Sequence, residues 1–130
     1  MRVLVTGSRD WPYPQVVHAE LDRLMADHTQ GRLIIVHGDC RAGADAYADQ
    51  WAKANARYGV RVERHPAKWN EYGRAAGPIR NSYMVSLGAG LCLAFNYMGS
   101  KGTKDCINRA SIAGIPIRAL ELDLVELKGK

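Results

Sequence analysis

The sequence has few cysteines and no long hydrophobic stretch. Its cysteines, Cys40, Cys92 and Cys106, have no CxxC spacing, and three thiols cannot all pair within one chain. This usage is typical of a reducing compartment rather than of a disulfide-rich secreted protein. The apolar runs, such as 3–5 and 33–36, are too short to cross a bilayer, and the chain shows no signal-peptide pattern. We therefore expect a cytoplasmic protein that does not enter a membrane.

The sequence also offers little to hold a metal ion. His18, His28, His37 and His65 are scattered along the chain and include no pair at helical spacing. We expect neither a metal site nor a cofactor.

The length and the charge of the chain set broad limits. A chain of 130 residues with 47% apolar residues is long enough for one core, so we expect a single domain over residues 1–130. Lysine and arginine total 18 against 13 acidic residues, which gives a net charge of +5. This balance favours anionic partners but does not separate a nucleotide from a nucleic acid.

Short buried-strand patterns alternate with helical patterns along the chain. We expect strands at 3–5, 33–36, 60–63, 91–95 and 115–120, of which the first is central and 60–63 is an edge strand. We expect helices at 14–27, 43–57, 79–87 and 103–113, and a loop at 67–78, which has no clear period. This alternation predicts an α/β fold, a single Rossmann-like doubly wound parallel sheet of about five strands.

Glycine-containing turns gather where such a sheet binds ligands, beyond the carboxyl ends of its strands. They lie at 7–9, 38–45, 77–81 and 99–103. The cations in or beside these turns are Arg9, Arg41, Arg80 and Lys101. Glycine lets backbone amides approach phosphate oxygens, and a cluster of cations is repulsive unless an anion is shared. The alternative is that these cations are solvated and pair with Asp39, Asp45 or Asp105.

These turns together resemble a known family. The segments Gly7-Ser8-Arg9, 38–45, 76–81 and 99–103 are similar to the YspA-like, YpsA-related branch of the SLOG superfamily, and the match runs from Arg2 to about Arg118. More distant members are the Lonely Guy phosphoribohydrolases and DNA-processing protein A. The resemblance implies the strand order 3-2-1-4-5, a nucleotide or nucleotide-derived ligand over the strand ends, and homodimers.

The turns and the resemblance together predict a set of ligand-binding residues. This set is Gly7, Ser8, Arg9, Gly38, Arg41, Gly43, Asp45, Arg80, Asn81, Gly99, Ser100, Lys101, Gly102 and Thr103. Backbone amides and the Thr103 hydroxyl would bind phosphate, and Arg80 would donate charge-assisted hydrogen bonds. Asn81 and Asp45 would bind ribose hydroxyls or the loop backbone, although Asp45 is equally suited to a helix N-terminus. Trp69 and Tyr72 could stack on a base or seal the edge of the core.

The chain departs from its hydrolytic relatives at two positions. Their phosphate motif reads Gly-Gly-x-Gly-Thr-x-x-Glu, whereas this chain has Ser100 at the second glycine and Cys106 at the glutamate. Asp105 comes one residue early, which on a helix is a rotation of about 100°. No catalytic residue is assigned, and the candidates are Arg80, Asp105 and Glu71.

Three functions remain open at this point. The first is binding of a phosphate-bearing nucleotide or nucleotide-derived molecule by a sensor or sequestering protein. The alternative is N-glycosidic hydrolysis of nucleotides, in which a carboxylate supports an oxocarbenium-like transition state. The third is a nucleic-acid-binding module, which we expect to bind weakly at most because no aromatic-interleaved basic stripe is present.

Overall fold

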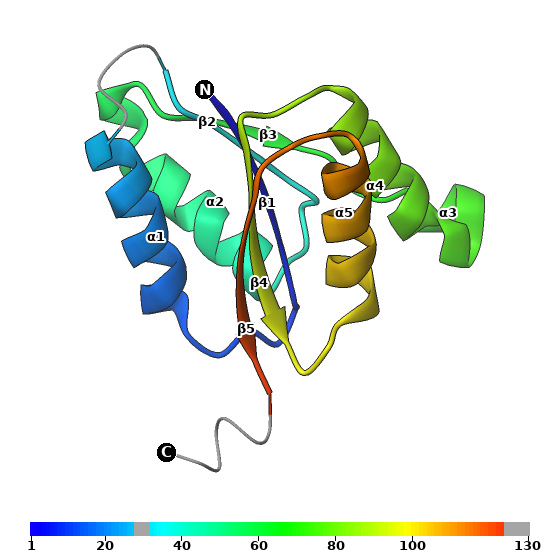
Figure 1. Cartoon of the computed structure of the whole chain (residues 1–130). Helices are drawn as coiled ribbons and strands as arrows, with labels where there is room; N and C mark the ends of the chain where they lie inside the picture. Colours follow the sequence, from blue (N-terminus) through cyan, green and yellow to red (C-terminus); the bar gives the residue numbers. More distant parts are fainter. Residues whose placement is uncertain (28–31, 124–130) are drawn as a thin grey trace.

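The computed structural model describes residues 1–27 and 32–123 of the chain. Five parallel strands form one sheet in the order β3-β2-β1-β4-β5 (Figure 1). The strands are β1 (Arg2–Gly7), β2 (Ile34–His37), β3 (Arg61–Arg64), β4 (Leu91–Tyr97) and β5 (Ile117–Leu122). The predicted strand order and α/β class are confirmed, with β1 central and β3 at one edge.

Helices cover both faces of this sheet. The α-helices are α1 (Pro14–Asp27), α2 (Ala44–Ala54), α3 (Trp69–Tyr72), α4 (Ala76–Ser86) and α5 (Lys101–Ile112), and the 3₁₀ helices are η1 (Ala56–Tyr58) and η2 (Gly73–Ala75). Figure 1 shows α1 and α2 on one face and α4 and α5 on the other, with α3 beyond α4. Within the described ranges no helix combines the length and apolar character needed to cross a membrane.

The alternation of side chains along β1 divides the core into two clusters. Val3 and Val5 point to the face of α1 and α2, where they join Val17 and Leu21. Leu4 points to the opposite face and packs in a cluster with Met84 of α4 and Cys106 of α5. Because both faces are covered, β1 is apolar at successive positions, which is the pattern that identified it as a buried strand.

The structure corrects the predicted end of the second helix. The sequence suggested a helix from 43 to 57, whereas α2 ends at Ala54 and a short 3₁₀ helix follows. Asn55 ends the α-helix. Its side-chain amide donates to the carbonyl oxygen of Trp51 at 2.8 Å and competes with the backbone hydrogen bonds of the helix. Gly59 then adopts a left-handed conformation, with φ of 90°.

The structure also corrects the segment between β3 and β4. The predicted loop 67–78 contains α3 and η2, and the helix expected at 79–87 begins earlier, at Ala76. Pro78 lies in the first turn of α4, where a backbone N–H has no intrahelical partner to lose, so the proline does not mark the start. The helix expected at 103–113 likewise begins at Lys101, and the other strand ends shift by a few residues. His28 lies outside the described residues.

Candidate functional site

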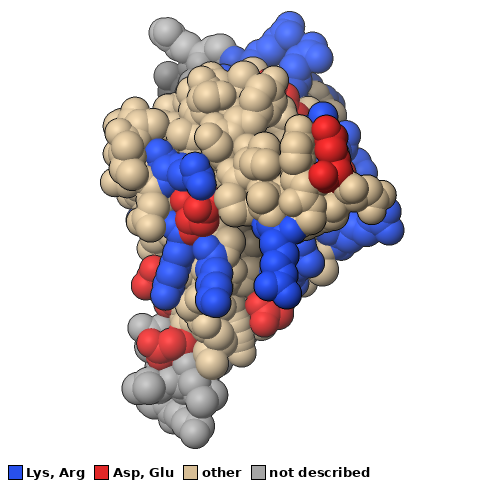
Figure 2. All heavy atoms as spheres, turned by 90° about the vertical axis from the view of Figure 1, so that its right-hand side faces the viewer, with Lys and Arg blue, Asp and Glu red and all other residues tan. Residues whose placement is uncertain are grey.

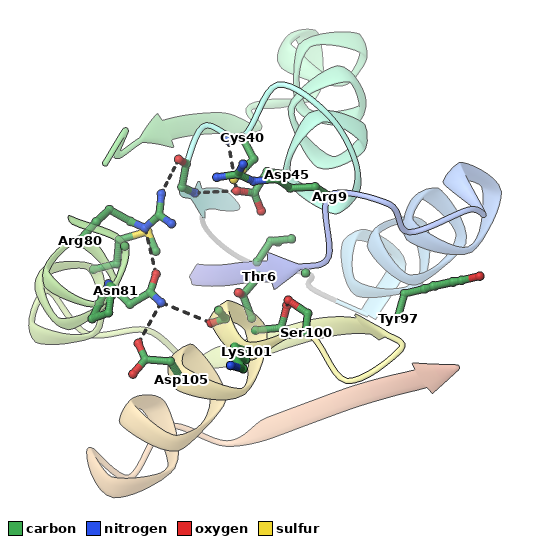
Figure 3. A pocket seen from close by; sticks show the side chains of 18 of the residues that line it. Thr6, Arg9, Cys40, Asp45, Arg80, Asn81, Tyr97, Ser100, Lys101 and Asp105 are labelled. Atoms are coloured by element: carbon green, nitrogen blue, oxygen red, sulfur yellow. Dashed lines mark hydrogen bonds between the residues drawn. The ribbon is translucent and has the colours of Figure 1, made fainter. Parts of the chain in front are cut away.

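A cavity of about 900 Å³ opens at the carboxyl ends of β1, β2 and β4. The strand order reverses between β1 and β4, and ligands of open α/β sheets bind at such a point. The structure brings most of the predicted site residues together there: Gly7, Arg9, Gly38, Asp45, Arg80, Asn81, Ser100, Lys101, Gly102 and Thr103 line the cavity. Figure 3 shows several of these side chains converging from separate elements.

Four other predicted residues do not line this cavity. They are Ser8, Arg41, Gly43 and Gly99. The buried Ser8 connects β1 to β4, because its Oγ accepts from the Tyr97 N–H at 2.8 Å and its N–H donates to the Phe95 carbonyl at 2.9 Å. Its own carbonyl accepts from the N–H of Ala44 at 3.3 Å, at the start of α2. Ser8 therefore fixes the geometry around the cavity.

The turn before α2 requires a glycine. Gly43 has a φ of 75°, and a Cβ there would collide with the carbonyl oxygen of Ser8. This close approach places Asp45 in the first turn of α2, where it is 4% exposed and lines the cavity. Asp45 Oδ2 accepts from the backbone N–H groups of Gly38 at 3.1 Å and Cys40 at 3.3 Å, so the carboxyl group closes the loop after β2.

Burial raises the pKa values of two groups at this loop, the Asp45 carboxyl and the Cys40 thiol. It raises the pKa of Asp45, against the opposing effect of the hydrogen bonds from Cys40 and of the positive charge of Arg80. It also raises the pKa of the Cys40 thiol, an effect to which Asp45 adds. Cys40 lines the cavity as a neutral thiol, which is a poor nucleophile.

Arg80 and Asn81 at the N-terminal part of α4 form a network across three segments. Arg80 Nη1 donates to the carbonyl oxygens of Gly38 at 2.6 Å and His65 at 3.3 Å, and its Nε donates to Asn81 Oδ1 at 2.9 Å (Figure 3). Asn81 Nδ2 donates to Asp105 Oδ2 at 3.0 Å and more weakly to the Gly102 carbonyl at 3.4 Å. These contacts occupy both ends of the Asn81 amide, so Asn81 positions its neighbours rather than offering a free group.

The N-terminus of α5 presents free backbone donors to the cavity. Lys104 makes the first intrahelical bond, to the carbonyl oxygen of Ser100 at 3.1 Å, so the preceding N–H groups of 101–103 have no partner within the helix. The Ser100 side chain does not cap them, and its Oγ accepts from the Thr103 hydroxyl at 3.2 Å. Uncapped N–H groups and the helix dipole favour an anion at this position.

The cavity contains more cationic side chains than its carboxylates neutralise. Arg9, Arg74, Arg80 and Lys101 line it. Over residues 1–27 and 32–123, none of these forms an ion pair with a carboxylate. Asp105 instead pairs with Arg109 at 2.9 Å. The described contacts thus do not support the alternative in which the cations pair with Asp39, Asp45 or Asp105.

Lys and Arg side chains also gather on one part of the molecular surface. Figure 2 views the side of the molecule that carries α4 and α5, and a broad uncharged area occupies much of it. Several Lys and Arg side chains lie below this area, toward the end of the molecule at which the strands terminate in Figure 1.

Of the two aromatic residues that could stack on a base, Trp69 lines the cavity and Tyr72 does not. The indole of Trp69 lies at the mouth of the cavity, 48% exposed, with the Arg9 guanidinium 5.8 Å from its ring centroid. Arg74 comes from η2, in the segment that was predicted to be a loop. Thr6, Cys40 and Tyr97 also line the cavity. Thr6, Cys40 and Tyr97 lie at or just after the end of a buried strand, and this position in the sequence could have identified them.

The candidate catalytic residues lie in different environments. Arg80 and Asp105 line the cavity, whereas Glu71 is exposed on α3 and does not. Cys106, at the glutamate position of the hydrolytic motif, is fully buried, and its thiol contacts Cys92 and Thr6 in the core. The motif position of the glutamate therefore holds a buried thiol in place of a carboxylate.

One group of side chains next to the cavity has metal-ligand chemistry. His37, Asp39 and Asp49 carry atoms within 4.8 Å of one another. His37 Nε2 bonds to Asp49 Oδ2 at 2.7 Å, and its Nδ1 accepts from the Asp39 N–H at 2.9 Å. Arg64 holds both Asp49 oxygens and lowers the pKa of that carboxyl well below its usual range. A metal ion would have to displace these bonds, so the group is better suited to bracing β2, β3 and α2.

Comparisons with known proteins agree with this architecture. Residues 1–72 match the model of the YspA, cpYpsA-related SLOG family. The chain is 43% identical over 118 residues to the Gene 61 protein of Mycobacterium phage D29, and the match covers 89% of this chain and 93% of the phage protein. No solved structure matches the chain significantly.

Proposed function

Because the chain belongs to the YspA, cpYpsA-related SLOG family, we propose that it binds a small phosphate-bearing nucleotide or nucleotide-derived molecule in the cavity at the strand ends. The observation that carries this proposal is that one cavity is lined both by cationic side chains that lack carboxylate partners within the described residues and by an uncapped helix N-terminus. An anion bound there would neutralise the cations and satisfy the free N–H groups at once.

The size and lining of the cavity fit a ligand larger than a phosphate ion. Ligand cavities of about 300 to 1,000 Å³ bury most of a drug-sized molecule, and this one is about 900 Å³. The phosphate would lie at the N-terminus of α5, near Lys101. Trp69 at the mouth offers a ring face on which a base can stack.

We favour binding over hydrolysis as the function of this cavity. An N-glycosidic hydrolase needs a carboxylate near the sugar, and the family's glutamate is replaced by the buried Cys106. Asp105 is held by Asn81 and Arg109, and Asp45 has a pKa raised by burial, so neither is a free carboxylate. Hydrolysis, with Arg80 orienting the phosphate, stays the second candidate because Arg80 and Asp105 both line the cavity.

A thermal-shift screen tests the proposal. The panel contains nucleoside monophosphates, ADP-ribose, NAD and cyclic nucleotides, with inorganic phosphate as the control for the anion alone. A ligand at about 100 times its dissociation constant should stabilise the protein by ~2.7 kcal/mol. Chromatography of the bound nucleotide after incubation then separates binding from hydrolysis, since only hydrolysis releases the free base. Absence of a shift with every nucleotide contradicts the proposal.

The proposal includes a sensor or sequestering role in a reducing, cytoplasmic compartment, and a homodimer. Support for the dimer comes from the resemblance and from α4, where Ile79, Tyr83 and the C-cap residue Leu87 are exposed at helical spacing. Light scattering coupled to size-exclusion chromatography tests it, and a monomer at micromolar concentration contradicts it.

A further inference from the structure

The loop that follows β2 forms part of the cavity wall, and side chains hold its backbone. Gly38 and Cys40 of this loop line the cavity, and their N–H groups donate to Asp45 Oδ2. The N–H group between them, that of Asp39, donates to Nδ1 of the buried His37 at 2.9 Å. Two side chains therefore fix three successive amide groups at the edge of the cavity.

These contacts assign the proton on the imidazole ring of His37. A backbone N–H group can donate only to a ring nitrogen that carries a lone pair, so Nδ1 is unprotonated and the hydrogen lies on Nε2. Nε2 then donates to Asp49 Oδ2 at 2.7 Å. Arg64 holds both oxygens of Asp49 and lowers the pKa of that carboxyl, so the acceptor stays ionised. His37 is thus a neutral ring in one defined tautomer, with both nitrogens in use.

One helix anchors the loop through both of these side chains. Asp45 and Asp49 are four residues apart on α2 and so lie on the same side of it. Asp45 reaches the loop directly, whereas Asp49 reaches it through the ring of His37. Asp39 has a φ of 57°, a left-handed conformation that is costly for a residue with a side chain. Its bond to Nδ1 of His37 stabilises this conformation.

A second proton on His37 is incompatible with this arrangement. It would place an N–H group on Nδ1 against the N–H group of Asp39, whose nitrogen is 2.9 Å away. The ring is 1% exposed, so it cannot turn this new N–H group to solvent. The backbone at Asp39 must then move away from the ring. Because Gly38 and Cys40 flank Asp39, this movement disturbs their bonds to Asp45 and the wall of the cavity.

The surroundings of His37 act on its protonation in both directions. The carboxylate of Asp49 favours a proton on the ring, whereas burial and the Asp39 N–H group oppose it. Histidine is the side chain that usually changes charge between about pH 5 and 8. The titratable and charged groups that face the ring, or act on it through Asp49, are Asp39, Asp45, Asp49, Lys53 and Arg64.

We propose that His37 is a positioning residue of the ligand cavity: its neutral tautomer holds the loop after β2 in the binding conformation, and a proton on Nδ1 releases the loop and weakens ligand binding. This inference rests on the proposed function, because it concerns the regulation of the same cavity. His37 does not line the cavity, so it acts through the loop and not by touching the ligand.

Nitrogen NMR of the ligand-free full chain tests the tautomer and the loop. At about pH 8, Nε2 of His37 should be protonated and Nδ1 unprotonated, and the amide of Asp39 should be protected from hydrogen exchange. On acidification to about pH 5.5, protonation of Nδ1 should coincide with the loss of this protection. A proton on Nδ1 at the higher pH, or protection of Asp39 that survives protonation of the ring, overturns the inference.

Two substitutions of His37 separate its two bonds. His37→Asn places an amide group at the position of Nδ1 and keeps an acceptor for Asp39, whereas His37→Gln keeps a donor for Asp49 and loses that acceptor. Neither side chain can gain a charge. Nucleotide affinity at about pH 8 should stay within about threefold of wild type in His37→Asn and fall about fivefold or more in His37→Gln. Melting curves at each pH show whether each variant is folded.

Titration calorimetry measures the pH dependence of binding. The probe is the nucleotide that binds most tightly among AMP, GMP, CMP, UMP, ADP-ribose, NAD and cyclic AMP. Wild type should bind it about fivefold or more weakly at about pH 5.5 than at about pH 8, relative to His37→Asn at the same pH. This ratio cancels the protonation of the nucleotide itself and of Asp45, because both also titrate in the variant.

His18 provides the matched control. It lies on α1, its Nε2 contacts the carbonyl oxygen of Tyr47 at 3.2 Å, and it does not line the cavity. His18→Gln should therefore keep the wild-type pH dependence.

The outcomes separate this inference from the proposed function. A pH dependence that is the same in wild type and folded His37→Asn overturns the role of His37 and leaves nucleotide binding standing. If no nucleotide of the panel binds to wild type, the proposed function fails, whereas the NMR measurement still decides whether His37 holds the loop.

Discussion

Substitution of Gly102 separates a ligand contact from a structural role. Gly102 lines the cavity in the first turn of α5, and a Cβ built on it has no heavy atom within 4 Å. Gly102→Ala should therefore fold normally, and the reduced entropy of the unfolded chain should raise the free energy of unfolding by about 0.4 to 1 kcal/mol. For a chain of this length that corresponds to a rise of about 2 to 4 °C in melting temperature.

The effect on ligand binding should have the opposite sign. If phosphate approaches the backbone at this turn, the new methyl group occupies its position and weakens charge-assisted bonds worth about 1.5 to 3 kcal/mol each. The dissociation constant for the tightest nucleotide of the panel should rise at least about tenfold in Gly102→Ala, and Gly102→Val should abolish binding. Thr103→Ala removes one hydroxyl and should cost only about 0.5 to 1.5 kcal/mol.

Calorimetric melting of the ligand-free variants and titration with the nucleotide measure the two effects separately. Ser111→Ala is the control, because Ser111 is exposed in the same helix and does not line the cavity. It should gain a few tenths of a kcal/mol, about what helix propensity gives, with unchanged affinity. Wild-type affinity in well-folded Gly102→Ala and Gly102→Val would show that the ligand does not contact this turn.

Three further predictions concern other parts of the molecule. Arg80→Ala should weaken nucleotide binding and also lower the free energy of unfolding by about 1 to 3 kcal/mol, because the carbonyls of Gly38 and His65 lose their donor; an unchanged melting temperature would contradict this bracing role. Burial raises the pKa of Asp45 in the folded chain above its usual value of 3.8. Between the two pKa values the unfolded chain has lost this proton and the folded chain still holds it, so the free energy of unfolding falls as the pH rises from 3.8 toward the folded pKa. Asp45→Asn should accordingly be more stable than wild type near neutral pH and lose this advantage toward pH 3, and pH-dependent melting checks the sign. Nucleic acid should bind weakly and lose affinity steeply with salt, and tight binding at physiological salt in a fluorescence titration would favour the nucleic-acid hypothesis.

The order of the elements was predictable from the sequence because the central strands are buried on both faces. Continuous apolar runs around Leu4 and Leu93 have few alternatives to a covered parallel strand. The ends of the helices were less predictable. Asn55 ends α2 through its own side-chain bond, and Pro78 lies inside a first helical turn, so the same residue types can either stop or begin a helix.

The gathering of most predicted site residues around one cavity was also predictable, but their individual contacts were not. Glycine-rich turns after strands are brought to one edge by topology alone, which is why Gly38 and Gly102 line one cavity. Whether a polar side chain is free depends on neighbours far away in sequence. Asn81 is occupied by Asp105 on another helix, and Asp45 by the backbone of the loop after β2, and nothing in the sequence predicts these contacts.

The two sides of the cavity differ in how firmly they are held. On one side, the single residue Ser8 joins the end of β1 to β4 and to α2, so these walls can move only together. By contrast, residues 68–75 are all exposed, and the Trp69 ring lies beside Gly77 and under the Arg9 guanidinium. The wall formed by β1, β4 and α2 is thus held by hydrogen bonds, whereas the wall formed by α3 and η2 is exposed and has fewer restraints. Any closure around a ligand should therefore appear as a displacement of α3 and η2 against an unchanged β1 and α2.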